Sequence, residues 1–290
     1  MPFRFFRALT SPAHFTSPLA TRQQKIAAFH IDRGAQLTLL FSHGNAEDLG
    51  MVYDWFREVS RELDVNVLAY DYTGYGLNTG PCSEEDCFAD IEAAFNYATD
   101  VLNVPPGRIV LYGRSLGSGP SCHLARQQSV KGSPVCGVVL QSPLMSAYRV
   151  AFHFRWTMPG DVFANIDKVA EVRSPVFILH GSRDEVVPYW HGQELYLALQ
   201  EPFRYKPFWV EGAGHNNIEM MCREDCSFFN RLNEFLDFLA PRRGEGDGAA
   251  MSLKDVLARS PASKKMATFG GGARNSGVSG GVSKLYAAKA

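Results

Sequence analysis

Short apolar runs alternate with longer amphipathic segments over residues 25–240. The short runs are rich in β-branched and aromatic residues and predict strands at 25–31, 37–41, 65–70, 109–112, 137–140, 176–179 and 208–210. Apolar positions at helical spacing predict helices over about 48–63, 83–98, 118–128, 189–200 and 225–239. Such alternation is typical of an α/β fold, in which a mostly parallel sheet carries helices on both faces.

One predicted strand leads into a turn with a recognisable pattern. The strand at 109–112 is followed by Gly113-Arg-Ser-Leu-Gly117, which fits G-x-S-x-G, and then by a helix. This order is the context of a nucleophile elbow, which exposes a serine hydroxyl at the edge of the sheet. Gly113 and Gly117 remove Cβ atoms that would collide in so sharp a turn. An ordinary strand-to-helix turn without a catalytic role is the alternative.

Two further polar residues follow strands closely. Asp184 lies in the loop after the strand at 176–179, and His215 lies in the loop after the strand at 208–210. Because the carboxyl ends of parallel strands meet at one edge, we expect Ser115, Asp184 and His215 to lie together. Their chain order is that of the α/β-hydrolase fold. His215 would take the proton of Ser115, and Asp184 would hold His215 in the correct tautomer.

The loop after the strand at 37–41 supplies an expected oxyanion donor. Ser42-His-Gly-Asn-Ala46 stands where α/β-hydrolases place one N–H group of the oxyanion hole. We therefore expect the backbone N–H groups of Asn45 and Leu116 to form the hole, with a plain loop as the alternative.

Other residues compete for these roles. Glu185 adjoins Asp184 and is the alternative acid. His43 is expected to make a supporting hydrogen bond near the site. His180 and His191 flank the loop of Asp184 and are expected to be structural.

Residues 144–173 lack the strand pattern and interrupt the alternation where α/β-hydrolases carry a lid. We expect a small lid here. Its apolar side chains suit an acyl group, although they could equally belong to the core: Met145, Phe152, Phe154, Trp156, Met158 and Phe163.

Composition limits the class of protein. The 290 residues are 46% hydrophobic and 20% charged, which suits one soluble enzyme domain with a tail. No apolar run reaches the length of a membrane span. The six cysteines form no C-x-x-C pair, which favours reduced thiols in the cytoplasm and speaks against a zinc site. We expect neither a metal nor a cofactor.

Charge is distributed unevenly along the chain. Residues 241–290 hold nine basic and three acidic residues, a net of +6, which leaves 20 basic and 27 acidic residues, a net of −7, in the first 240. We expect an N-terminal extension (1–24), a hydrolase domain (25–240) and a disordered Gly/Ser-rich tail (241–290). The basic tail fits either a solvated spacer or a weak contact with anionic membranes. The basic start fits an amphipathic membrane-surface segment, an organelle transit peptide or a plain irregular N-terminus.

Six stretches together resemble the α/β-hydrolase domain-containing protein 17 family: residues 41–46, 70–76, 111–117, 142–146, 149–152 and 209–216. The resemblance covers about residues 25–240. It implies a serine hydrolase that removes palmitate from protein cysteines, with Ser115, Asp184 and His215 at the family's catalytic positions. S-acylated proteins would then be its partners, without nucleic acid, and we expect a monomer.

The chain also departs from that family. Family members carry an N-terminal cysteine cluster that is palmitoylated and tethers them to membranes, whereas this chain has no cysteine before Cys82. Bem46-like hydrolases share the elbow and histidine motifs, so a carboxylesterase and a serine peptidase are alternatives to an acyl-protein thioesterase. A non-enzymatic scaffold of the same fold is the alternative from another class.

Overall fold

The computed structural model describes residues 9–10, 25–152 and 156–239. The predicted extension at 1–24, apart from the short strand β1 (Leu9–Thr10), lies outside these residues, as do Phe154 and the predicted tail at 241–290. Within the described residues, no helix combines the length and the apolar character needed to cross a membrane.

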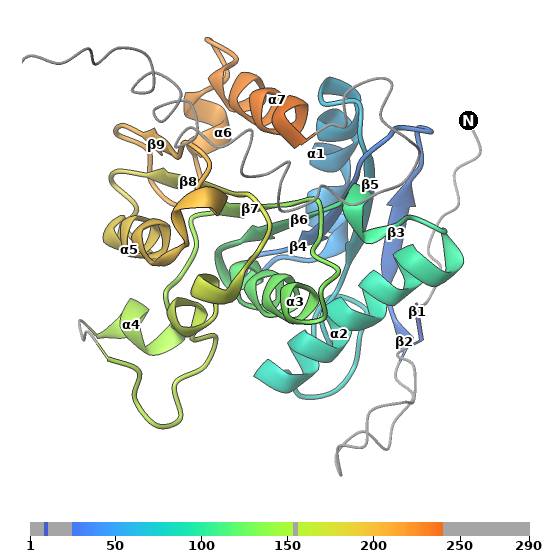
Figure 1. Cartoon of the computed structure of the whole chain (residues 1–290), viewed down its shortest axis with the longest axis horizontal. Helices are drawn as coiled ribbons and strands as arrows, with labels where there is room; N and C mark the ends of the chain where they lie inside the picture. Colours follow the sequence, from blue (N-terminus) through green and yellow to red (C-terminus); the bar gives the residue numbers. More distant parts are fainter. Residues whose placement is uncertain (1–8, 11–24, 153–155, 240–290) are drawn as a thin grey trace, which may run out of the picture.

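Seven strands form one sheet in the order β3-β5-β4-β6-β7-β8-β9 (Figure 1). Their bounds are β3 (Ala28–Ile31), β4 (Thr38–Ser42), β5 (Asn66–Tyr70), β6 (Ile109–Arg114), β7 (Gly137–Gln141), β8 (Val176–Gly181) and β9 (Phe208–Val210). Only β3 runs antiparallel to its neighbour, and every other pair is parallel. The mostly parallel sheet predicted from the sequence is confirmed.

The predicted strand at 25–31 is interrupted. It divides into β2 (Lys25–Ile26), which pairs with β1 in a separate antiparallel sheet, and β3. At the break, the Ala27 N–H donates to the side chain of Asn78 at 2.8 Å instead of joining a strand ladder. A side-chain acceptor from a distant loop gives no signal in the local sequence.

Helices cover both faces of the sheet (Figure 1). Their bounds are α1 (Leu49–Glu62), α2 (Glu84–Asn96), α3 (Ser118–Val130), α4 (Ala147–Ala151), α5 (Trp190–Ala198), α6 (Ile218–Met221) and α7 (Ser227–Leu239). α2, α3 and α5 pack on one face, and α1 and α7 pack on the other.

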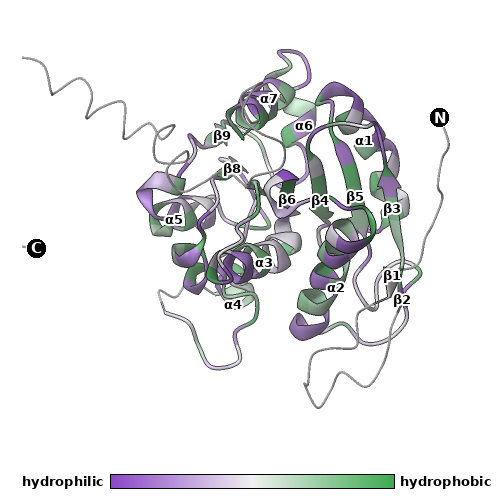
Figure 2. Ribbon diagram, turned by 45° about the vertical axis from the view of Figure 1, so that its right-hand side comes forward, coloured by the Kyte–Doolittle hydropathy of each residue, from purple (hydrophilic) through white to green (hydrophobic). Residues whose placement is uncertain are grey.

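Two core layers follow from the alternation of side chains along the strands. On β4, Leu40 packs with the α2 and α3 side, whereas Leu39 and Phe41 pack with α1 and α7. Figure 2 shows green, apolar residues along the central strands and purple residues on outward helix surfaces. Each large apolar side chain buried in these layers contributes roughly 1.5–3 kcal/mol to folding.

Side chains cap the N-termini of α1 and α2, the two long helices before β6. Asp48 accepts the Met51 N–H at the start of α1, and Ser83 accepts the Asp86 N–H at the start of α2. The second cap is the one that the Ser-x-x-Asp spacing predicts. The helix predicted from about 225 begins at Ser227, because Cys226, directly before it, has a non-helical φ of 55°.

Candidate active site

Ser115 lies in a strained turn between β6 and α3. Its φ is 50°, in the left-handed region that a non-glycine residue rarely adopts. A Cβ atom on Gly117 would lie 2.0 Å from the carbonyl oxygen of Ser42, and one on Gly113 would lie 2.5 Å from that of Gly117. The two glycines therefore permit the close approach of β6, the turn and the loop after β4.

The structure brings Ser115, His215 and Asp184 into one hydrogen-bonded line. His215 Nε2 lies 3.0 Å from Ser115 Oγ, and His215 Nδ1 lies 2.7 Å from Asp184 Oδ2. These residues follow β6, β9 and β8, whose carboxyl ends meet at one edge of the sheet. All three are buried, which strengthens the polar contacts between them.

Asp184 is surrounded by hydrogen-bond donors. Its Oδ1 accepts the N–H groups of Val186 and Val187, and its Oδ2 lies 3.2 Å from His180 Nε2 as well as 2.7 Å from His215 Nδ1. Burial alone would raise the pKa of Asp184, but the hydrogen bonds from His180 and His215 outweigh it and hold this pKa well below its usual range. Asp184 is therefore ionised at neutral pH.

Glu185, the alternative acid, contacts a different group. Its Oε2 accepts the backbone N–H of His215 at 3.3 Å, whereas the imidazole faces Asp184. A Cβ atom on Gly214 would lie 2.5 Å from the same carboxylate oxygen. The structure thus pairs Asp184, and not Glu185, with the His215 ring.

Two neighbouring histidines, His180 and His191, make hydrogen bonds to loops around the site. His180 Nε2 lies 2.9 Å from the carbonyl oxygen of Val187, on the loop that holds Asp184. His191 accepts the Met145 N–H through Nδ1, and its Nε2 lies 3.2 Å from the carbonyl oxygen of Arg149. Burial lowers the pKa of His191 to about 4, so this ring is neutral at pH 7.

The loop after β4 is fixed by aromatic hydroxyls. Tyr72 donates to the His43 carbonyl oxygen at 2.8 Å, and Tyr75 donates to Asn45 Oδ1 at 2.6 Å. His43 Nδ1 lies 2.9 Å from the carbonyl oxygen of Gly44, and burial lowers the His43 pKa. The side chain of Asn45 thus holds the loop against the turn after β5.

A chain of polar side chains joins the three loops around Ser115. Glu47 accepts the Gly44 N–H at 2.7 Å and lies 2.6 Å from Arg114, which precedes Ser115. Arg114 also donates to Asn216, the neighbour of His215, at 3.1 Å. Sequence reasoning missed this Glu47–Arg114–Asn216 chain because side-chain pairs between distant loops leave no periodic or motif signal.

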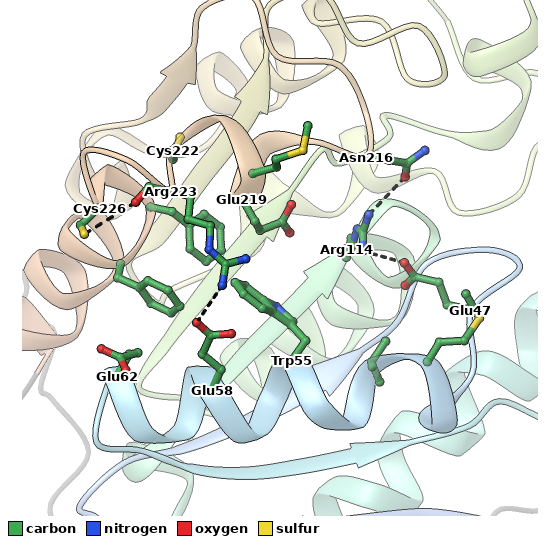
Figure 3. A pocket seen from close by; sticks show the side chains of 15 residues that line it. Glu47, Trp55, Glu58, Glu62, Arg114, Asn216, Glu219, Cys222, Arg223 and Cys226 are labelled. Atoms are coloured by element: carbon green, nitrogen blue, oxygen red, sulfur yellow. Dashed lines mark hydrogen bonds and ion pairs between the residues drawn. The ribbon is translucent and has the colours of Figure 1, made fainter.

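A cavity of about 630 Å³ lies beside this chain, between α1 and the α6–α7 segment (Figure 3). Trp55, Phe228 and Phe229 form an aromatic cluster in its lining. Glu47, Arg114 and Asn216 close the end nearest to Ser115 and His215, which themselves are not part of the lining.

The predicted lid segment is anchored to the elbow. Ser118 Oγ donates to the Ser115 carbonyl oxygen at 2.6 Å, and Asn165 Nδ2 donates to Ser118 Oγ at 3.2 Å. Phe163 is buried against Gly119, so this aromatic belongs to the core. Phe152 and Trp156 are instead 59% and 67% exposed.

A serine hydroxyl, an imidazole and an ionised carboxylate lie in line, which are the groups that acyl transfer through a serine requires. In the part of the chain that the structure describes, no group of three or more His, Cys, Asp or Glu side chains could hold a metal ion.

Comparison with known proteins identifies relatives of this chain. The family model described as alpha/beta hydrolase fold matches residues 38–166. Alpha/beta hydrolase domain-containing protein 17C of Xenopus laevis is 42% identical over 209 residues, which are 72% of this chain and 64% of that relative. Protein 17B of Xenopus tropicalis is 39% identical over 220 residues, which are 74% of this chain and 72% of that relative.

Solved structures agree on the fold. An esterase from Pyrococcus furiosus matches with a TM-score of 0.61 and 21% identity, over 81% of this chain and 92% of that one. The chain spans somewhat less than two thirds of the length of the protein 17C relative. The identity and coverage of the Xenopus tropicalis protein show that this chain belongs to the alpha/beta hydrolase domain-containing protein 17 family.

Proposed function

We propose that this protein is a serine hydrolase that cleaves acyl thioesters, with Ser115 as nucleophile, His215 as general base and acid, and Asp184 as the group that orients His215. The hydrogen-bonded line from Ser115 Oγ through His215 to Asp184 carries this proposal. A free hydroxyl is a weak nucleophile, and a neighbouring base removes its proton as attack occurs.

The reaction has two halves. Ser115 Oγ attacks the thioester carbonyl carbon while its proton passes to His215 Nε2. The C–S bond then breaks, and His215 returns the proton to the departing cysteine sulfur. Water then attacks the acyl-Ser115 ester while His215 takes its proton. The ester C–O bond breaks, and His215 returns the proton to Ser115 Oγ, which releases the fatty acid and restores the hydroxyl. Asp184, whose pKa is held low, stays ionised and stabilises the imidazolium in both halves.

The backbone N–H groups of Asn45 and Leu116 form the oxyanion hole in this proposal. Leu116 directly follows the nucleophile, and Asn45 lies in the loop that Gly117 approaches closely. By analogy, one such donor contributes roughly 3–4 kcal/mol to the barrier reduction. The Asn45 side chain is occupied by the Tyr75 hydroxyl, which supports a role for the backbone and not the amide.

An S-palmitoylated protein is the proposed substrate. The motif resemblance supports this choice, and the exposed Phe152 and Trp156 of the lid segment suit an acyl chain. All six cysteines are free thiols, which supports a reducing compartment such as the cytoplasm. We propose a monomer there, in weak contact with membranes.

A matched set of substrates tests the proposal. One peptide carries a palmitoyl group through a cysteine thioester, a serine ester or a lysine amide, and an octanoyl series provides the chain-length control. We expect fastest release from the palmitoyl thioester and none from Ser115→Ala. Fastest cleavage of the serine ester would indicate a carboxylesterase, and cleavage of the peptide backbone would indicate a peptidase. No cleavage, together with no reaction of wild type with a fluorophosphonate probe, would indicate a scaffold.

A further inference from the structure

Two cysteine side chains are in contact at the start of α2. Cys82 is exposed, Cys87 is buried, and their Sγ atoms lie 3.5 Å apart. At this distance one thiol can donate its S–H to the other sulfur. An accessible thiol therefore lies directly against a protected one.

The first turn of α2 determines how the two cysteines are placed. Ser83 caps the helix, because it accepts the Asp86 N–H at 3.0 Å and donates its hydroxyl to Asp86 Oδ2 at 2.7 Å. Cys82 is the residue before this cap, and Cys87 is the fourth residue of the helix. Side chains at these two positions commonly pack together and fix the path of the chain into the helix. Two apolar residues would make the same contact, but only two thiols can also be joined by a covalent bond.

The pair adjoins the turn after β5, which supports the loop after β4. Cys87 belongs to the same core cluster as Tyr72, and Tyr75 packs against that cluster. The hydroxyls of these two tyrosines bond the loop after β4. A Cβ atom on Gly74 would lie 3.2 Å from the backbone nitrogen of Cys82 and 3.4 Å from its Cβ atom. A displacement of Cys82 is therefore transmitted through direct contacts to this turn.

We propose that Cys82 and Cys87 form an oxidation site, at which a peroxide joins the two sulfurs in a disulfide and thereby shifts the turn after β5. A disulfide bond is about 2 Å long, so the two sulfurs must approach each other by roughly 1.5 Å. Because this turn supports the loop after β4, the movement links the oxidation state of the pair to the site around Ser115. The link rests on the proposed function, whereas formation of the disulfide does not.

The reaction needs hydrogen peroxide and no other reagent. The thiolate of Cys82 attacks one oxygen of the peroxide, the O–O bond breaks, and the second oxygen leaves as water after taking up a proton. Cys82 is then a sulfenic acid. The sulfur of Cys87 attacks the sulfur of Cys82, the S–O bond breaks, and the oxygen leaves as water with the Cys87 thiol proton. Overall, two thiols lose two protons and two electrons, and the peroxide is reduced to two water molecules.

Burial slows this reaction without preventing it. It raises the pKa of Cys82 and raises the pKa of Cys87 well above its usual range, so little of either is thiolate at pH 7. We therefore expect the pair to respond to sustained exposure to peroxide. Cys226 provides an internal comparison, because it is also exposed but its Sγ lies 3.8 Å from the carbonyl oxygen of Arg223.

Mass spectrometry of the full chain tests whether the disulfide forms. The reduced protein is incubated with hydrogen peroxide, the remaining thiols are alkylated, and tryptic fragments are analysed. Cys82 and Cys87 fall on one fragment, residues 62–108. We expect this fragment to become two hydrogens lighter and to escape alkylation, and we expect dithiothreitol to reverse both changes. Cys226 should instead be oxidised singly.

Two variants separate the steps, and thermal unfolding establishes that both are folded. In Cys87→Ala the sulfenic acid of Cys82 has no second sulfur to react with, so dimedone should label Cys82 on the order of ten-fold more than in wild type. Cys82→Ser is the control for oxidation elsewhere in the chain. With peroxide, kcat of wild type for an acyl thioester should fall on the order of ten-fold and return with dithiothreitol, whereas kcat of Cys82→Ser should stay unchanged.

Amide hydrogen exchange over residues 43–47 reports the link to the site without catalysis, and it should become faster in the oxidised wild type. Cys82 that ends as a sulfinic acid or in a disulfide between two chains, with Cys87 still alkylated, would overturn the proposal. Equal labelling by dimedone in wild type and Cys87→Ala would do the same. A disulfide that changes neither kcat nor hydrogen exchange would overturn its link to the site. A wild type without hydrolysis before oxidation would count against the proposed function alone, because the mass and exchange measurements need no turnover.

Discussion

Replacing Asp184 by asparagine exchanges one carboxylate oxygen for an NH2 group in a site where four donors converge. Two of these donors are the backbone N–H groups of Val186 and Val187, which face Oδ1. A backbone N–H can only donate, so it requires an acceptor at this position. The amide oxygen must therefore take that position, which turns the NH2 group toward His215 Nδ1. His215 can accept this hydrogen bond only with its own proton on Nε2, the atom that faces Ser115.

The wrong tautomer removes general-base catalysis without removing a side chain. With a proton already on Nε2, His215 has no lone pair directed at Ser115 Oγ. The expected loss in kcat is on the order of 10⁴-fold, as for the equivalent change in a Ser-His-Asp protease, which corresponds to about 5.5 kcal/mol of transition-state stabilisation.

Steady-state hydrolysis of an acyl thioester measures this loss, and Glu185→Gln is the matched control. That substitution makes the same chemical change one residue away, at a carboxylate that accepts the His215 backbone N–H and does not pair with the His215 ring. We expect Glu185→Gln to keep kcat within about three-fold of wild type, a change of well under 1.4 kcal/mol. Comparable losses in both variants, or Asp184→Asn activity above a tenth of wild type, would refute the tautomer argument.

Three other perturbations probe the elbow, the polar chain and the pH response. Gly117→Ala should destabilise the fold by about 3 kcal/mol or more, seen in denaturant unfolding, because its Cβ would lie 2.0 Å from the Ser42 carbonyl oxygen. Glu47→Ala should lower kcat roughly 10- to 100-fold with little change in KM, because it releases the loop after β4 from Arg114, and Glu47→Gln should restore part of the loss. His191→Gln tests how the free energy of unfolding depends on pH. Burial lowers the pKa of His191 in the folded state to about 4 from 6.5, so the unfolded chain binds a proton that the folded chain does not. Between pH 7 and pH 4 the free energy of unfolding of wild type should therefore fall by about 3 kcal/mol relative to the variant. A constant difference in unfolding free energy across this range would contradict it.

The proximity of Ser115, Asp184 and His215 was predictable because each residue follows a parallel strand, and strand position fixes the edge at which a loop lies. The role of the two elbow glycines was also predictable from the sequence, because G-x-S-x-G between a strand and a helix requires a sharp local turn. The catalytic roles of these residues, and the oxyanion roles of Asn45 and Leu116, stay predictions.

Interactions between distant loops were not predictable. The ion pair of Glu47 with Arg114 depends on how two strand ends are placed, and the G-x-S-x-G motif does not specify the residue at position 114. The break at Ala27 depends on one side chain, Asn78, 51 residues away. The aromatic residues of the lid segment also differ in burial, because Phe163 packs on Gly119 in the core while Trp156 is exposed. Their residue types alone predict the same tendency to be buried.

Trapping the covalent intermediate tests the central claim most directly. The protein is mixed with a palmitoyl-thioester peptide and quenched with acid within the first turnover, and the modified residue is located by mass spectrometry of proteolytic fragments. The proposed mechanism predicts one palmitoyl group per chain, on the fragment that contains Ser115, and none in Ser115→Ala. A palmitoyl group on another residue, or hydrolysis by Ser115→Ala at a rate near that of wild type, would contradict it.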